Sequence, residues 1–159
     1  MTDNIDIQLA ERESVFEVEE GIILAPKFDE NGLIPVVTTD SNSGELLMHG
    51  YMNKEALILT IQNKEAYYWS RSRKSIWHKG KTSGLTQKVN SIRIDDDQDC
   101  IWLIVDVMGV GASCHVGYKS CFYRSITVDN NKLVLKFVEK EKLFDPEVVY
   151  KGQDNPTKL

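Results

Sequence analysis

Cys100-Ile101-Trp102-Leu103-Ile104-Val105-Asp106-Val107-Met108 is the most apolar stretch of this chain, and it decides the fold. β-Branched and aromatic residues dominate it, and such residues favour strands. Because nearly every position is apolar, we predict that this strand lies at the centre of a sheet.

The segments on either side predict further strands and one main helix. Asn53 is a suitable cap for a helix that starts at Lys54 and runs to about Ala66. The expected strands are 33–37, 45–50, 67–70, 87–94, 121–128 and 133–139, the last two forming a hairpin around residues 129–131. Strands joined by short turns predict an α+β fold, a mostly antiparallel sheet in a single domain.

Length and composition are those of an ordinary globular protein. The chain has 159 residues, of which 42% are hydrophobic and 27% charged. No apolar run reaches the roughly 18 residues that cross a membrane, and the N-terminus does not look like a secretory signal. We therefore expect a cytoplasmic protein. Three cysteines do not suit a disulfide framework, so they are candidate metal ligands or nucleophiles.

Charge is distributed unevenly along the chain. Net charge is −5, which argues against bulk nucleic-acid binding. Residues 1–20 hold seven acids and one base, whereas residues 66–94 hold only basic charges and are followed directly by aspartates. A basic block beside an acidic one indicates an anion pocket next to a cation site, and a solvated basic face is the alternative.

Three aspartates alternate after the strand expected at 87–94: Asp95, Asp97 and Asp99. If this segment is extended, alternate residues share one face at about 7 Å intervals, and unpaired carboxylates there would repel one another. A hard divalent cation such as Mg²⁺ or Ca²⁺ removes that conflict, since it prefers oxygen ligands. An acidic turn without a metal is the alternative.

The cysteines suggest a second metal site. Cys114 and Cys121 enclose a glycine-containing loop that can bring both thiolates to one zinc ion, and Cys100 can supply a third. Three thiolates and a position open to water are typical of a catalytic zinc, which yields hydroxide near neutral pH. Three buried cysteines packed as small hydrophobic residues are the alternative.

His115 adjoins Cys114 and is a candidate general base. The ordinary pKa of an imidazole, about 6.5, suits proton transfer near neutrality. His115 can instead be a fourth zinc ligand or a hydrogen-bond partner of a ligand.

The segment Lys79-Gly80-Lys81-Thr82-Ser83-Gly84 has the composition of an anion cradle. Its glycines let the backbone approach a ligand closely, and its lysine and hydroxyl side chains supply charge and donors. The glycine spacing excludes a Walker P-loop. Two upstream arginines strengthen the prediction of a phosphate site. The predicted substrate contacts are Arg71, Arg73, Lys79, Thr82, Ser83 and Gly84. Together with the metal candidates, they indicate metal-assisted hydrolysis of a phosphorylated small molecule.

Several sequence blocks between residues 33 and 124 occur in a characteristic order. They are GYMNKEAL at 50–57, WSRSR at 69–73, WHKGKTSG at 77–84, the aspartate run, CHVG at 114–117 and SCF at 120–122. In this order they resemble the phosphoribosyl-AMP cyclohydrolase family, whose members open the adenine ring of phosphoribosyl-AMP between N1 and C6 in the third step of histidine biosynthesis.

The resemblance implies a homodimeric α+β enzyme with a zinc site and a magnesium site. It implies that zinc-bound hydroxide attacks C6 and that His115 is the base. The implied Mg²⁺ ligands are Asp95, Asp97 and Asp99, and the implied Zn²⁺ ligands include Cys114 and Cys121. We expect an acidic extension at 1–20, a cyclohydrolase domain at 21–140, and a C-terminal extension with a polar tail at 141–159.

One position departs from the family pattern, Asp-Cys-Asp-x-Asp. Asp96 stands where that pattern has a cysteine, and a cysteine occurs instead at Cys100. We expect Cys100 to be the third zinc ligand, within the chain or across the dimer, with Asp96 as the alternative. A structural-zinc module that binds a nucleotide or protein partner without turnover is the alternative function, and a thiol redox protein is a third.

Overall fold

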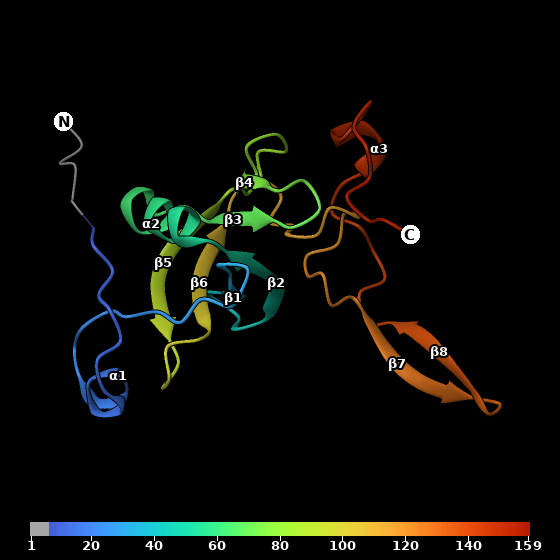
Figure 1. Ribbon diagram of the computed structural model, residues 1–159. Coiled ribbons are helices and arrows are strands. Elements are labelled where there is room, and N and C mark those ends of the chain that lie inside the picture. The colour runs from blue at the N-terminus through green and yellow to red at the C-terminus, as the bar shows by residue number, and fades with distance from the viewer. Residues whose placement is uncertain (1–6) are drawn as a thin grey trace.

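A four-stranded sheet forms the centre of the computed structural model, which describes residues 7–159. Its strands lie in the order β2 (Leu46–Met52), β1 (Ile34–Asp40), β6 (Ile101–Val107) and β5 (Gln87–Ile94). Helix α2 (Lys54–Asn63) and the hairpin of β3 (Tyr67–Ser70) and β4 (Ser75–His78) lie over one face of this sheet (Figure 1). The apolar stretch quoted first is therefore an inner strand, as predicted.

The sheet is antiparallel at both edges and parallel in the middle. β1 pairs antiparallel with β2, and β5 pairs antiparallel with β6, but β1 and β6 run parallel. The predicted α+β class with mostly antiparallel strands is thus confirmed, and the central parallel pair was not predicted. Parallel partners need a long crossover connection, here β2 through β5, so no local sequence pattern marks them as neighbours.

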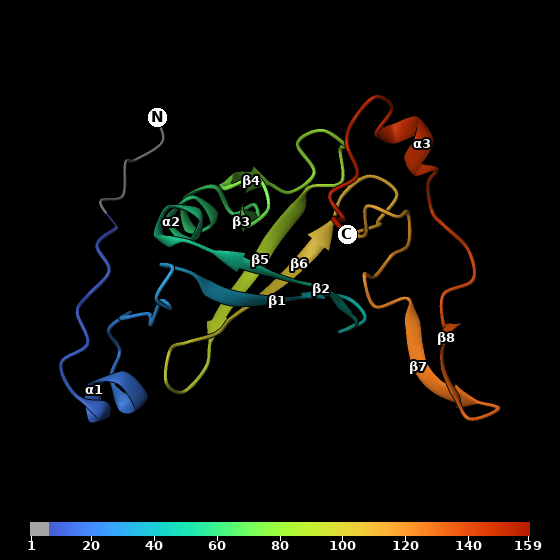
Figure 2. The same ribbon diagram turned by 45° about the vertical axis from the view of Figure 1, so that its right-hand side comes forward.

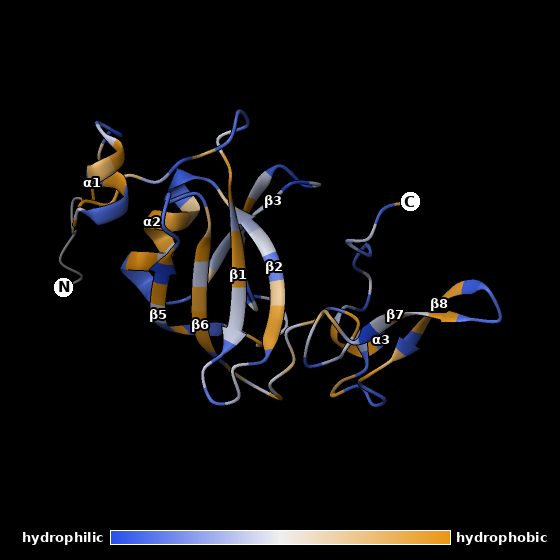
Figure 3. Cartoon of the chain, turned by 90° about the horizontal axis from the view of Figure 1, so that it is seen from below, coloured by the Kyte–Doolittle hydropathy of each residue, from blue (hydrophilic) through white to orange (hydrophobic). Residues whose placement is uncertain are grey.

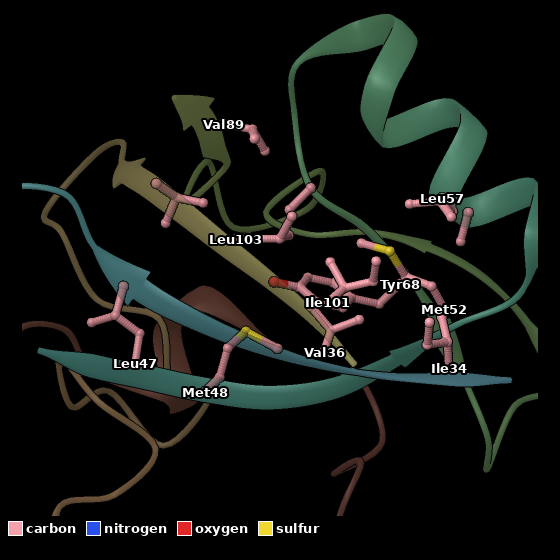
Figure 4. Close-up of a cluster of buried hydrophobic side chains, with 13 residues drawn as sticks. Ile34, Val36, Leu47, Met48, Met52, Leu57, Tyr68, Val89, Ile101 and Leu103 are labelled. Atoms are coloured by element: carbon pink, nitrogen blue, oxygen red, sulfur yellow. The ribbon is translucent and has the colours of Figure 1, made fainter. Parts of the chain in front are cut away.

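The hydrophobic core lies between the sheet and its cover of α2 and β3–β4. Alternate residues of β6, namely Ile101, Leu103 and Val105, are buried, as are Ile34 and Val36 of β1. All of them belong to one cluster with Leu57 of α2 and Tyr68 of β3, and most of its members are labelled in Figure 4. Because every second residue of the central strands is buried, one face of the sheet is apolar, and α2 and the β3–β4 hairpin pack on that face.

Helix α2 is the main helix, as expected. The Asn53 side chain accepts a 2.8 Å hydrogen bond from the Ala56 N–H, which satisfies one of the free donors of the first turn. The helix ends earlier than predicted because Lys64 adopts the left-handed region, with φ of 54°, and its N–H bonds to the Thr60 carbonyl. Two shorter helices are α1 (Val15–Glu20) and α3 (Pro146–Val149).

The predicted closing hairpin is present and projects away from the sheet. β7 (Arg124–Asp129) pairs antiparallel with β8 (Lys132–Phe137), and this ribbon extends beyond the rest of the fold in both side views (Figures 1 and 2). Figure 3 shows hydrophobic residues along β5 and β6 and also on this ribbon, far from the core. Apolar ribbon residues such as Ile126 and Leu133, each 80% exposed, therefore have no cover in a single chain.

The acidic leader is only partly described. Its first six residues lie outside the described part. The rest contains the short helix α1, which Ser14 caps through a 3.1 Å bond from the Glu17 N–H. The domain boundaries at 20 and 140 stay predictions. Within residues 7–159, no helix has the length and apolar character needed to cross a membrane.

Candidate functional site

The three aspartates converge in the loop between β5 and β6, which we call the aspartate loop (residues 95–100). Asp95, Asp97 and Asp99 each offer an oxygen, and these oxygens lie within 4.8 Å of one another. Asp95 organises the turn, because its carboxylate accepts bonds from the N–H groups of Asp99 at 2.9 Å and Cys100 at 3.0 Å. The loop thus presents three acidic oxygens to one point, the donor set that a hard divalent cation takes.

The convergence arises from a turn and not from strand alternation, which corrects the expectation of an extended segment. β5 ends at Ile94, and Gln98 adopts a left-handed conformation with φ of 57°. The carboxylates are therefore closer together than the about 7 Å that alternate strand positions would give. Their proximity raises the pKa of Asp99, first through its hydrogen bond with Asp95 and also through repulsion from Asp95 and Asp97.

A second cluster forms where the chain leaves the other end of β6, in the segment we call the cysteine loop (residues 112–123). Backbone bonds fold this loop on itself: Ser113 N–H to Lys119 O at 2.9 Å, and Cys114 N–H to Tyr118 O at 3.1 Å. The Cys121 N–H bonds to Leu47 O of β2 at 2.7 Å. The loop is therefore closed on itself and tied to β2.

Gly117 is required by the closure of this loop. Its φ is +107°, and a Cβ there would lie 2.5 Å from the Phe144 carbonyl oxygen. Only glycine adopts such a conformation without strain. The glycine noted in the sequence therefore allows both the turn and the close passage of the C-terminal segment.

The two thiols behave as a pair that shares one proton. A hydrogen bond from Cys121 is the main cause that lowers the pKa of Cys114 to about 6, and the Val116 N–H and Lys79 contribute further. The same bond, together with burial of the thiol, raises the pKa of Cys121, although the residue as a whole is exposed. One thiolate beside one thiol at neutral pH is a donor set that a soft cation can take over.

Lys79 lies against the cysteine loop and not in open solvent. The side chain is buried, and its Nζ donates a 2.6 Å bond to the Ser113 carbonyl. Burial lowers the pKa of Lys79, and the neighbouring Cys121 and Cys114 oppose that effect. Its ammonium also lies 5.2 Å from the centre of the Trp77 ring. In this structure the lysine predicted to bind substrate supports the loop that carries the cysteines.

His115 presents one free nitrogen in this loop. Its Nε2 is buried and has no hydrogen-bond partner among the described residues. Burial is the main cause that lowers the pKa of His115, and nearby Lys79 lowers it further, whereas a hydrogen bond with Asn155 raises it. The imidazole is therefore neutral near pH 7, with a lone pair or a proton available to a ligand.

A buried polar chain, which sequence reasoning missed, connects the sheet to the cysteine loop. Tyr68 Oη lies 2.7 Å from Thr38 Oγ1 and donates to Gln87 Oε1 at 2.7 Å. Gln87 Nε2 in turn donates to Ser113 Oγ at 3.3 Å. The available signal was Gln87 itself, a polar residue at a buried position of an alternating strand.

The predicted substrate residues divide into two groups. Arg71, Arg73, Thr82 and Gly84 are exposed, and Ser83 is half-buried. The guanidinium of Arg71 lies 4.1 Å from the centre of the Tyr51 ring, and that of Arg73 lies 5.8 Å from the centre of the Trp77 ring. Trp77 thus has Arg73 and the buried Lys79 near its ring, which places exposed basic charge near the cysteine loop.

One chain does not bring Cys100 to the other two cysteines. Cys100 precedes the first residue of β6, whereas the cysteine loop follows the last, and seven strand residues span about 20 Å. Figures 1 and 2 show these two loops at opposite ends of β6. Asp96 lies at the same end as Cys100, so neither candidate for the third zinc ligand reaches the pair within one chain.

Comparisons with known proteins agree on one family. Residues 48–123 match the family model described as phosphoribosyl-AMP cyclohydrolase. A protein of that name from Rhodopseudomonas palustris (strain BisA53) is 53% identical over 136 residues, which cover 85% of this chain and 92% of that protein. Its namesake from Sinorhizobium fredii is 51% identical over 134 residues, 84% of this chain and 88% of that protein. The protein of the same name from Bradyrhizobium diazoefficiens is 48% identical over 135 residues, which cover 85% of this chain and 95% of that protein.

Proposed function

Because this chain belongs to the phosphoribosyl-AMP cyclohydrolase family, we propose that it hydrolyses the N1–C6 bond of the adenine ring of phosphoribosyl-AMP in histidine biosynthesis. Water adds at C6, the N1–C6 bond breaks, C6 becomes an amide carbonyl, and N1 takes up a proton. The ring is electrophilic because N1 carries the phosphoribosyl group. Catalysis then needs an activated water, a proton carrier and a site for phosphate.

The cysteine pair would hold zinc. Its donor set fits that ion, since the bond from Cys121 lowers the pKa of Cys114 to about 6, and the adjacent Nε2 of His115 has no hydrogen-bond partner among residues 7–159. When bound, zinc supplies a Lewis acid that lowers the pKa of water. The free thiols suit a reducing compartment, and a cytoplasmic location stays part of this proposal.

His115 is the proposed proton carrier. Its lowered pKa keeps the imidazole neutral near pH 7, so Nε2 can accept a proton from the attacking water. Asn155 bonds the ring and fixes its orientation. The buried ammonium of Lys79 favours the thiolate state of the pair and holds Ser113 in place.

Substrate phosphate is assigned to the exposed basic residues. Arg71 and Arg73 extend over aromatic rings of β2 and β4, and the loop of Thr82, Ser83 and Gly84 follows. Charged guanidinium groups form strong bonds with phosphate oxygens. The predicted substrate contacts in this loop remain Thr82, Ser83 and Gly84. Lys79 can contact the substrate only if its ammonium breaks its hydrogen bond with the Ser113 carbonyl.

Magnesium is assigned to Asp95, Asp97 and Asp99. Three carboxylate oxygens within 4.8 Å suit a hard cation. Bound there, Mg²⁺ would neutralise charge on the enzyme and on a phosphate-bearing substrate. The cation would also relieve the repulsion that raises the pKa of Asp99.

A homodimer completes the proposal. Cys100 and the cysteine pair lie at opposite ends of β6, so the predicted set of three thiolates needs a second copy of the chain. The exposed apolar ribbon of β7 and β8 supplies a surface for such a copy. The residues directly opposite one another on its apolar face are Ile126 with Leu135 and Val128 with Leu133.

The paired thiols of Cys114 and Cys121 carry this proposal, together with the adjacent Nε2 of His115, which no group in the described part of the chain bonds. The test incubates the purified protein with phosphoribosyl-AMP and follows the ultraviolet change of ring opening. We expect turnover that a zinc chelator abolishes and added zinc restores. Undiminished turnover in protein shown to lack zinc would contradict the zinc assignment, and no turnover in zinc-loaded, magnesium-supplied protein would contradict the function.

Replacement of His115 separates a base from a ligand. In His115→Ala we expect turnover to fall about 100-fold or more, with zinc content by elemental analysis equal to that of the parent. Loss of zinc together with turnover would make His115 the fourth ligand and favour the alternative of a structural-zinc module. Unchanged turnover would remove His115 from the mechanism.

A further inference from the structure

Gln98 is the best-anchored residue of the aspartate loop, although it carries no charge. Its side chain is 5% exposed. Its Oε1 accepts a 2.8 Å bond from the Ala25 N–H, and its Nε2 donates to Val18 O at 3.0 Å and Ile23 O at 3.3 Å. Its carbonyl accepts a 2.7 Å bond from the Lys27 N–H. Every one of these partners belongs to the segment we call the N-terminal arm (residues 7–27).

Arg12 makes a second connection between the arm and the loop. One guanidinium nitrogen donates to Ala25 O at 2.7 Å, and the other donates to Asp97 O at 2.8 Å. The guanidinium thus joins the backbone of the arm to the middle of the aspartate loop. Arg12 is the single basic residue of the first twenty, and it reaches the loop through the Asp97 backbone carbonyl.

The arm has anchors of its own on the body of the protein. The Ala10 N–H bonds to Leu24 O at 3.1 Å, which joins the segments of the arm before and after α1. Leu9 and the adjoining Phe28 pack against the hydrophobic core. The arm is therefore a fixed support for the loop and not a free tail.

Three carboxylates that share one point repel one another before a cation arrives. Bonds within the loop, such as that from the Asp99 N–H to Asp95, hold only part of the turn. The left-handed backbone at Gln98, between Asp97 and Asp99, needs support from outside the loop. Asp97 and Gln98 receive that support from Arg12 and Ala25 of the arm, which lie more than seventy positions earlier in the chain.

We propose that the N-terminal arm, through Arg12 and Gln98, is a positioning device that keeps the aspartate loop in its cation-binding shape and so sets the affinity for the divalent cation. This inference rests on the magnesium site of the proposed function. Arg12 and Gln98 touch neither substrate nor cation. They act through the backbone of Asp97 and its neighbours, as supporting partners of metal ligands do.

The experiment measures Mn²⁺ binding by electron paramagnetic resonance, since oxygen sites for Mg²⁺ also take Mn²⁺. The full-length, zinc-loaded parent is compared with Gln98→Ala, Arg12→Ala and, as a control for the loss of one positive charge elsewhere, Lys151→Ala. We expect the Mn²⁺ dissociation constant to rise about 10–100-fold in the first two variants and to stay unchanged in the control. Gln98→Gly tests the backbone separately, because glycine accepts the left-handed conformation yet loses the side-chain bonds. It should also weaken binding.

Turnover gives a second readout that a general loss of stability would not produce. Arg12→Ala should need more Mg²⁺ for half-maximal turnover and recover the parent rate when Mg²⁺ saturates. Parent-like Mn²⁺ affinity in both Gln98→Ala and Arg12→Ala overturns the positioning role and leaves the proposed function intact. Failure of the parent itself to bind Mn²⁺, with Asp97→Asn identical to it, overturns both the aspartate site and this inference.

Discussion

At the scale of single residues, the chemistry of the cysteine loop depends on a few buried contacts. Cys114 is the more acidic thiol because it receives hydrogen bonds and lies near the ammonium of Lys79. Cys100, at the other end of β6, has its pKa raised by burial and by the charges of Asp95 and Asp99. The pKa values of two identical side chains are thus shifted in opposite directions, and the difference comes from partners that only the fold supplies.

Replacement of Cys121 should raise the pKa of Cys114. In metal-free protein we expect one thiolate to form as the pH rises, with a titration midpoint at about pH 6. The ultraviolet absorbance of the thiolate, recorded against pH, measures this midpoint. Cys121→Ala removes the largest stabilising bond, so the midpoint should move upward, toward the ordinary value of about 8.5. Cys100→Ala is the matched control and should leave the midpoint in place. A midpoint that stays at its parent value in Cys121→Ala would disprove the shared proton.

At the scale of elements, the polar chain of Thr38, Tyr68, Gln87 and Ser113 joins β1, β3 and β5 to the cysteine loop. All four residues are buried, and each polar group finds a partner. Such a network is favourable only when it is fully bonded, because an unpaired polar group in the core is costly. The chain therefore fixes how β3 and the cysteine loop sit on the sheet.

Tyr68→Phe should lower the free energy of unfolding by about 1–3 kcal/mol. The change removes the hydroxyl and leaves Gln87 Oε1 without its donor in the core. Urea denaturation followed by fluorescence measures the loss. Tyr67→Phe is the control, because the Tyr67 ring stacks on His78 and its hydroxyl makes no hydrogen bond among the described residues. Equal stability of the two variants would argue against a structural role for the network.

At the scale of the whole molecule, two features of the single chain look incomplete. The predicted zinc ligands are divided between the ends of β6, and the ribbon of β7 and β8 exposes one apolar face. A two-stranded ribbon is barely stable alone and needs to bury such a face. A symmetric dimer can satisfy both requirements, since each copy then offers the other the same surface.

A charge on the apolar face of the ribbon should therefore separate the proposed dimer. Ile126→Lys should shift sedimentation toward the monomer, with loss of zinc and turnover. Ser125→Lys, whose side chain lies on the opposite face of the same strand, is the control and should remain dimeric. A parent protein that sediments as a monomer at all concentrations, with zinc bound, would rule out the shared site.

Mixing two inactive variants tests directly whether the site is shared. Cys100→Ala keeps the cysteine pair, and Cys114→Ala keeps Cys100. A mixed dimer therefore has one complete site, and an equal mixture should recover about a quarter of the parent activity after random exchange of subunits. Persistent inactivity after exchange has been shown would contradict ligands from two copies.

The sequence alone determined the α+β class, the central strand, the main helix, the hairpin and the family resemblance. These follow from local patterns: apolar runs, the cap at Asn53, turn residues and the order of short motifs. The same local patterns identified Asp95, Asp97 and Asp99 as a cluster, because they are close in the chain, although the spacing considered for them was that of an extended segment and the structure has a turn.

Only the tertiary structure decided what depends on distant partners. It placed β1 parallel to β6, buried Lys79 against Ser113, separated Cys100 from Cys114 by the length of β6, and joined Arg12 to Asp97. Contacts between residues far apart in sequence form when packing closes the chain, and no local pattern records them. The residue types therefore fixed which chemistry is available, and the fold fixed which groups act together.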